Sequence, residues 1–108
     1  QKYGAISEDG KVKISIAYDS LYATSHDFIL GIKQGKYGLF NQLGEQLLQP
    51  LYSEIRPTRD NHYIVVRRGL SGLIDASGAY SIPLKYYHIA EFSKGRYACL
   101  VTMPEILE

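Results

Sequence analysis

The sequence predicts an all-β protein made of three tandem repeats of 34 residues, and two observations carry this prediction. The first is that four series of glycine, tyrosine or aliphatic residues recur at an interval of 34. The second is that apolar and polar residues alternate with a period of two, which is typical of half-buried strands. The recurring series are Gly4, Gly38 and Gly72; Gly10, Gly44 and Gly78; Tyr18, Tyr52 and Tyr86; and Leu21, Ile55 and Ile89.

These series divide the chain into units 2–35, 36–69 and 70–103, followed by a short tail. The same interval is also typical of helical tetratricopeptide arrays, so the interval alone does not distinguish helices from strands. The alternation does, because Val12, Ile14 and Ile16 would be scattered around a helix but lie on one face of a strand. We therefore expect one all-β domain, residues 1–108, built from the three units.

Each unit is expected to contain about three antiparallel strands. A short strand such as residues 72–75 leads to the turn glycine, and the second strand follows that turn. This second strand is expected to end near Pro50 or Pro83, because proline cannot donate a backbone hydrogen bond to a neighbouring strand. A Tyr-x-x-aliphatic corner then precedes the third strand, for example residues 62–67. Successive strands should pair as a β-meander, stacked unit after unit.

Composition and charge restrict the classes of protein to be considered. The 12 Lys and Arg residues nearly balance the 11 Asp and Glu residues, so no overall field favours nucleic acid as a partner. No apolar run is long enough to span a bilayer. The single cysteine, Cys99, leaves the redox compartment open, and the protein could be cytoplasmic or exported. Because the chain begins at Gln1 rather than at Met, we expect it to be a fragment of a longer protein.

The repeated residues resemble the WG-repeat family. The family's unit begins Lys-Trp-Gly-Leu-Ile-Asp, continues through a turn glycine and an apolar strand ending near Ile-Pro, and closes with Tyr-Asp-x-Ile and a further strand. The matching segments here are residues 36–41, 72–75, 82–83, 18–21 and 86–89, so the resemblance extends over nearly the whole chain. The departure is the tryptophan, whose place is taken by Tyr3, Tyr37 and Ser71.

This resemblance implies a bacterial protein with a tandem β array and a binding or scaffolding role. Members of the family are often larger than this chain and share no established chemistry. The resemblance therefore transfers no catalytic residue to any position of this sequence.

Tyrosine is the prominent candidate binding residue, since the chain has 10 tyrosines, 3 phenylalanines and no tryptophan. A tyrosine ring offers a flat apolar face with a polar tip. Seven tyrosines recur in register and are expected to pack between units, namely Tyr3, Tyr37, Tyr18, Tyr52, Tyr86, Tyr63 and Tyr97. The three that remain, Tyr22, Tyr80 and Tyr87, are the candidates for a binding surface.

One local concentration of positive charge occurs in the middle unit, at Arg56, Arg59, Arg67 and Arg68. The negative charge of Asp60 partly compensates it. These arginines could attract an anionic partner or a carboxylate-bearing peptide. The alternative is a solvated strand face and loop, since no regular aromatic residues are interleaved with them.

No spacing in the sequence predicts a metal site, a cofactor or a catalytic residue. His26, His62 and His88 occupy three different positions of the unit, and no second His or Cys lies at ligand spacing. Cys99 falls at a small-residue position of the third strand and is expected to be inert. Short polar side chains share one position before each turn and are expected to brace its backbone. These are Ser7, Asn41 and Asp75.

We therefore expect a non-catalytic module that binds or scaffolds other proteins. The first alternative is a carbohydrate- or envelope-binding module, which a groove containing Tyr22, Tyr80 and Tyr87 would favour. The second alternative is an enzyme with an acid/base carboxylate pair, which two carboxylates converging in a deep pocket would favour. Because an open array leaves strand edges at both ends, self-association through the end strands is also expected.

Overall fold

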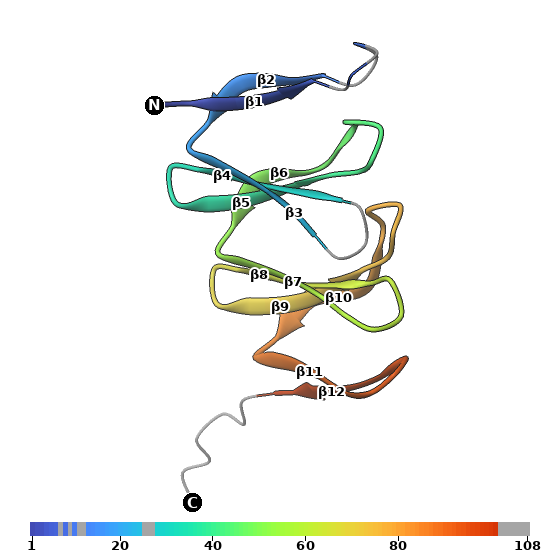
Figure 1. Cartoon of the computed structure of the whole chain (residues 1–108). Helices are drawn as coiled ribbons and strands as arrows, with labels where there is room; N and C mark the ends of the chain where they lie inside the picture. The colour runs from blue at the N-terminus through green and yellow to red at the C-terminus, as the bar shows by residue number, and fades with distance from the viewer. Residues whose placement is uncertain (7, 9, 11–12, 25–27, 102–108) are drawn as a thin grey trace, which may run out of the picture.

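The computed structural model describes residues 1–6, 8, 10, 13–24 and 28–101, and within these residues it contains twelve β-strands and no helix (Figure 1). The predicted all-β fold class is confirmed. Ser7, Val12 and His26 lie outside the described residues. The strands are β1 (Tyr3–Ile6), β2 (Lys13–Tyr18), β3 (Ser20–Ala23), β4 (Ile29–Lys33), β5 (Lys36–Phe40), β6 (Gln46–Tyr52), β7 (Glu54–Pro57), β8 (Tyr63–Arg67), β9 (Leu70–Ile74), β10 (Tyr80–Tyr86), β11 (His88–Ser93) and β12 (Arg96–Leu100).

Each unit contains four strands rather than the three that the sequence predicts. The additional strands are β3, β7 and β11, which follow the tyrosine corners. In the middle unit, Ser53 is a single bent residue between Tyr52, the last residue of β6, and Glu54, the first residue of β7. The corner is therefore one residue long, and the residues assigned to it from the sequence form a strand of their own.

The sheets are shared between neighbouring units. The last two strands of the first unit and the first two of the second form one antiparallel sheet in the order β3-β4-β5-β6. The second and third units are joined in the same way by the sheet β10-β9-β8-β7. At the two ends, the hairpins β1-β2 and β11-β12 form two-stranded sheets.

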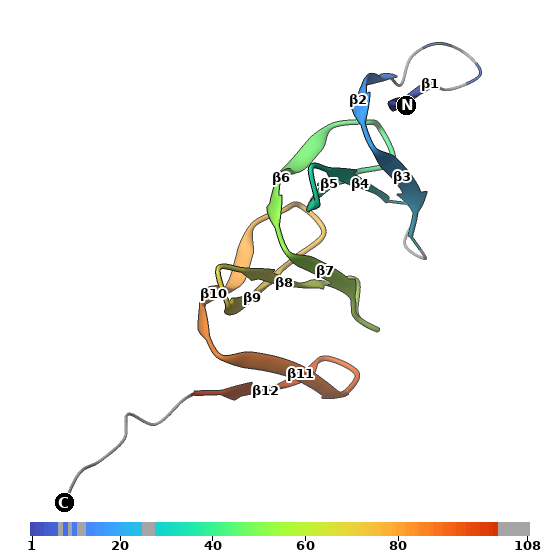
Figure 2. The same ribbon diagram turned by 90° about the vertical axis from the view of Figure 1, so that its left-hand side faces the viewer.

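The four sheets are stacked as successive layers from the N-terminal hairpin to the C-terminal hairpin (Figures 1 and 2). The stack is elongated along the direction in which the layers follow one another (Figure 2). Strands follow one another as a meander within each sheet, and the chain passes to the next layer at each tyrosine corner. The predicted array is thus confirmed, with the meander interrupted where the layers change.

A recurring glycine shapes the first hairpin of each unit. Tyr37 lies opposite Tyr52 and Leu39 lies opposite Leu48, so three residues of β6 face Gly38 alone. A Cβ atom on Gly38 would lie 2.8 Å from the Leu48 carbonyl oxygen, which is closer than such atoms approach in real structures. Only glycine therefore permits the two backbones to come this close. The same arrangement recurs at Gly4 and Gly72.

Pro50 and Pro83 are both among the residues that face the recurring glycine, where the strand register shifts. Pro50 is within β6 and Pro83 is within β10, so the prediction that they end the second strand is wrong. β6 and β10 are outermost strands of their sheets, and bulged residues on an outer strand need not donate to a ladder. The same irregularity in β2 leaves Ile16 exposed, although the alternation predicts it on the buried face with Ile14.

The turns of these hairpins are braced as the sequence predicts. The Asn41 side-chain oxygen accepts hydrogen bonds from the backbone N–H groups of Leu43 and Glu45, each at 2.9 Å. Asp75 holds the backbone two and four residues further along in the same way. Gly44 has a φ of 83°, a left-handed conformation that favours glycine.

Tyr18, Tyr52 and Tyr63, three of the tyrosines in repeat register, are buried, which confirms the predicted packing role for these residues. Tyr52 and Tyr63 belong to the core cluster between the two four-stranded sheets. Tyr18 meets Phe40 edge to face, with ring centroids 5.4 Å apart. Tyr3 is more exposed because it lies in an end layer that is covered on fewer sides.

Two side-chain contacts between units recur with the repeat. In the first, a corner tyrosine reaches a residue 28 positions later: Tyr18 accepts a hydrogen bond from Gln46 at 3.1 Å, and the hydroxyls of Tyr52 and Tyr80 are 2.6 Å apart.

The second recurring contact joins a threonine to a tyrosine 39 positions later. The Thr24 Oγ1 atom lies 3.0 Å from the Tyr63 hydroxyl, and the Thr58 Oγ1 atom lies 2.9 Å from the Tyr97 hydroxyl. Both kinds of contact join the two four-stranded sheets to each other. The first kind also joins the β1-β2 hairpin to its neighbouring sheet, and the second kind also joins the β11-β12 hairpin to its neighbouring sheet.

We expect Tyr52→Ala to lower the free energy of unfolding of the whole domain by roughly 3–5 kcal/mol, the range for truncating a large core side chain. The Tyr52 ring is 7% exposed and lies between two shared sheets. Denaturant unfolding followed by circular dichroism measures the loss. Tyr87→Ala is the matched control because that ring is exposed. An unchanged unfolding free energy in Tyr52→Ala would refute the core role of this tyrosine.

Candidate functional site

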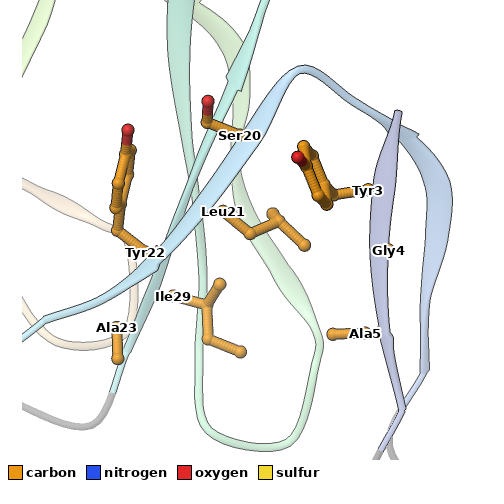
Figure 3. Close-up of a pocket in the computed structure, with 8 residues that line it drawn as sticks. All are labelled: Tyr3, Gly4, Ala5, Ser20, Leu21, Tyr22, Ala23 and Ile29. Carbon is orange, nitrogen blue, oxygen red and sulfur yellow. The ribbon is translucent and has the colours of Figure 1, made fainter. Parts of the chain in front are cut away.

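An open apolar groove of about 540 Å³ lies between the N-terminal hairpin and the first four-stranded sheet (Figure 3). The side chains of Leu21 and Ile29 lie between β3 and β1, and Tyr3 and Ala5 face them from β1. Tyr22 stands at the opposite side. The complete lining is Tyr3, Gly4, Ala5, Ser20, Leu21, Tyr22, Ala23 and Ile29.

The equivalent surface is covered one unit later. Ile55 and Tyr63 hold the places of Leu21 and Ile29 in the second unit, and both are buried. Phe28, from the preceding unit, stacks on the Tyr63 ring with centroids 5.5 Å apart. The groove is therefore a surface that, inside the array, receives the second hairpin of the preceding unit.

An unpaired backbone edge runs beside the groove. In the four-stranded sheets, β5 and β9 each lie between two neighbours, whereas β1 pairs with β2 alone in the described part of the chain. Unpaired N–H and C=O groups along an edge form a template for another strand. Groove and edge together offer apolar contacts and backbone hydrogen bonds, the combination by which sheets recognise an added strand.

The three tyrosines proposed from the sequence lie in different places. Tyr22 is exposed and lines the groove. Tyr80 contacts the Tyr52 hydroxyl, and burial together with this hydrogen bond raises the pKa of Tyr80. Tyr87 is exposed at the corner between β10 and β11. The tyrosine that accompanies Tyr22 in the groove is Tyr3, although its repeat position predicted packing between units.

The four arginines do not form one patch. Arg59 lies in the loop after β7, whereas Arg67 and Arg68 lie at the far end of β8. That strand is five residues long, which corresponds to about 16 Å. Arg56 is ion-paired with Glu54 on the same strand. The charge that is concentrated in the sequence is thus divided between the two ends of the β7-β8 hairpin.

A cluster of polar side chains joins the second and third units. Thr58 donates a hydrogen bond to the Asp60 carboxylate at 2.7 Å, and the Tyr97 hydroxyl donates to the same oxygen. His62 Nδ1 lies 2.9 Å from the Asp60 carbonyl oxygen. Nearby, the Glu91 carboxylate accepts the backbone N–H of Arg59, with both oxygens at 3.1 Å. Both carboxylates are therefore engaged in holding β11-β12 against the β7-β8 loop.

The protonation states of Asp60 and Tyr97 are fixed near neutral pH. Hydrogen bonds from Tyr97 and Thr58 hold the pKa of Asp60 below its usual value. Burial, with the neighbouring Asp60 carboxylate, raises the pKa of Tyr97 to about 12. A carboxylate that stays ionised and a phenol that stays protonated suit a structural contact better than proton transfer near neutral pH.

Within the residues that the structure describes, no group of three or more His, Cys, Asp or Glu side chains is placed to hold a metal ion. Cys99 is a free, exposed thiol on β12. The same described ranges contain no helix with the length and apolar character needed to cross a membrane.

The shared sheets and the recurring contacts define a tandem β-repeat module. A family model described as the WG containing repeat matches residues 3–36, 37–70 and 72–99. The chain therefore belongs to the WG-repeat family, as its sequence pattern indicated. No curated protein and no solved structure matches the chain.

The structure also accounts for the position that carries tryptophan in the family pattern. Tyr37 lies directly opposite the corner tyrosine Tyr52 on the neighbouring strand. Ser71 lies opposite Tyr86, and it is almost completely buried. The residue at this position thus faces the corner tyrosine, and the third unit places a small buried side chain where the others have a ring.

The groove was not predicted from the sequence. Leu21 belongs to a recurring aliphatic series, and Ile55 and Ile89 of that series are core residues, so its pattern indicates burial. The signal that could have revealed the groove is position: Leu21 belongs to the first unit, over which the described chain places no preceding hairpin.

We expect Tyr97→Phe to reduce the free energy of unfolding at neutral pH by about 1 kcal/mol, because a partly exposed hydrogen bond to a carboxylate is lost. The depressed pKa of Asp60 contributes stability above pH about 4, the usual value, and this contribution is lost as the pH falls through the folded-state pKa. The variant should therefore lose less stability than the parent chain on acidification.

Denaturant unfolding at several pH values between 7 and about 2.5 measures this difference, with Tyr87→Phe as the control for an exposed ring. Equal acid dependence in Tyr97→Phe and the parent chain would contradict the account of this cluster.

Proposed function

We propose that the chain is a non-catalytic protein-binding module that takes up an apolar extended or hairpin segment in the N-terminal groove. The observation that carries this proposal is the conjunction of the groove over Leu21 and Ile29 with the unpaired edge of β1. A bound strand would extend the β1-β2 sheet through its backbone while its side chains covered the groove.

The array itself provides a model for the bound segment. One layer further along, the β3-β4 hairpin pairs with β5 and covers the surface formed by Ile55 and Tyr63. Phe28 and Leu30 supply the apolar contacts to that surface. A partner that brings a large apolar residue to this surface would therefore fit the groove.

A glycan is the second candidate ligand, and it is favoured by one observation. Tyr3 and Tyr22 are both about half exposed and lie on opposite sides of the groove (Figure 3). Aromatic faces of this kind can stack on sugar rings, although the floor between them is aliphatic rather than polar.

We expect a synthetic peptide of residues 20–33, which carries Phe28 and Leu30, to bind the chain saturably at the groove. Amide resonances of β1, β3 and β4 should shift in a nuclear magnetic resonance titration. Ala23→Asp should weaken binding by about tenfold or more, because it brings an unpaired charge to an exposed position in the groove.

Ala76→Asp is the matched control, since it makes the same substitution at an exposed turn of the third unit. Equal loss of affinity in both variants, or shifts confined to other strands, would contradict the proposed site. Saturable binding of cellohexaose that is lost in Tyr22→Ala, with no peptide binding, would favour the glycan instead.

A further inference from the structure

We propose that the occupant of the groove is a second copy of this chain, whose β11-β12 hairpin docks head to tail on the N-terminal layer. This inference rests on the proposed function, because it assigns a partner to the same groove and edge. The two copies would form a four-stranded sheet in the order β11-β12-β1-β2, with the first two strands from one copy and the last two from the other.

The first argument is that the two end layers are complementary halves. Both four-stranded sheets consist of one hairpin of the β3-β4 kind and one of the β5-β6 kind. The N-terminal layer contains only the second kind and the C-terminal layer only the first kind among the described residues. Within these residues, each end layer therefore carries the kind of hairpin that is not seen in the opposite end layer.

The second argument comes from the side chains that would meet. At the internal joints, threonine contacts the tyrosine hydroxyl 39 residues later, as in Thr24 with Tyr63. Where two copies meet, Phe92 of the first copy would take the place of the threonine. Ile29 of the second copy would take the place of the tyrosine. Both members of the polar pair are thus replaced by apolar residues, so neither would leave a buried hydroxyl without a partner.

The third argument is the exposure of apolar side chains at both ends. Phe92 is 61% exposed on β11, on the hairpin that would enter the groove. It would supply the large apolar contact there, because the positions of Phe28 and Leu30 are Arg96 and Ala98 in this hairpin. The N-terminal layer likewise presents Tyr3, Ile6 and Ile16 to solvent, and the C-terminal layer presents Leu100. Docking would cover apolar surface on both partners at once, which is the favourable term in most protein association.

The internal sheets also fix the register of the proposed joint. Leu30 lies opposite Leu39 across the β4-β5 pair. In the end strands, Ala98 of β12 has the repeat position of Leu30, and Ala5 of β1 has the repeat position of Leu39. In a head-to-tail pair, Ala98 of one copy should therefore lie opposite Ala5 of the next, with Cβ atoms roughly 5 Å apart.

This contact is heterologous, because it joins different surfaces of the two copies. Such a contact leaves one free end on each copy and so can continue into chains of three or more copies. A symmetric pairing of two β1 edges would instead stop at a dimer. The two modes are distinguishable by where cross-links form.

Disulfide cross-linking tests the inference directly. Ala5→Cys and Ala98→Cys are each introduced into a Cys99→Ser background, so that each chain carries one thiol. Mixing the two variants under mild oxidation should give a covalent dimer, whereas neither variant alone should do so. A chain with both new cysteines should give a ladder of oligomers, since each copy can link at both ends.

Cross-links within one single-cysteine variant alone, with no covalent pairing between the two variants in the mixture, would overturn the head-to-tail mode. So would the absence of any cross-link in the mixture while both variants retain the parent circular dichroism spectrum. A mixture of Leu43→Cys and Ala98→Cys in the same background controls for random collision, because Leu43 lies in the β5-β6 turn.

A second measurement does not depend on introduced cysteines. Phe92→Asp should raise the dissociation constant for self-association, followed by sedimentation velocity over a concentration series, by about tenfold or more. Leu43→Asp, at a residue that is 63% exposed, is the matched control and should leave that constant unchanged. Equal effects of the two variants would overturn the inference.

Failure of this inference can be separated from failure of the proposed function. If the 20–33 peptide binds at the groove but the chain remains monomeric and uncross-linked, the groove is a binding site for another protein. If neither the peptide nor the second copy binds, both proposals fail.

Discussion

The structure depends on one constraint, namely that no unit of this chain completes a sheet by itself. Each four-stranded sheet takes one hairpin from each of two consecutive units. Backbone hydrogen bonds between β4 and β5, and between β8 and β9, therefore cross the unit boundaries as regular antiparallel ladders. The repeat in the sequence and the layer in the structure are offset by half a unit.

This offset explains why the recurring contacts connect residues 28 and 39 positions apart rather than 34. A corner tyrosine such as Tyr18 closes one layer and contacts Gln46 on the next. Thr24 likewise meets Tyr63, which belongs to the following layer. The unpaired edges and the groove also follow from the offset, because each end layer of the described chain contains one hairpin, which is half of a four-stranded sheet.

Much of the fold could be predicted from the sequence because its determinants are local and repeated. Turn glycines, the bracing residue Asn41 and the packing of Tyr52 each depend on a position that recurs. The fourth strand was missed because β7 has only four residues, too few to show an alternation beside a corner. The bulge opposite Gly38 was missed because it depends on how closely two backbones approach, which no single segment reveals.

The candidate site was less predictable than the fold. Non-repeating residues were the natural candidates, yet the strand length separates Arg59 from Arg67, and Tyr80 is engaged with Tyr52. The groove instead uses residues of ordinary repeat type, such as Leu21, whose partners in the next layer are buried. Whether such residues are exposed depends on whether another layer packs on them. That is a property of the array and cannot be read from a motif.

Native-state hydrogen exchange measures the central claim, that the shared sheet and not the sequence unit is the cooperative element. At denaturant concentrations below the unfolding transition, the free energies of opening for amides in β4 and β5 should be equal and should depend equally on denaturant. These two strands belong to different units but to one sheet. Amides of β4 that instead open together with β1 and β2, independently of β5, would contradict the account.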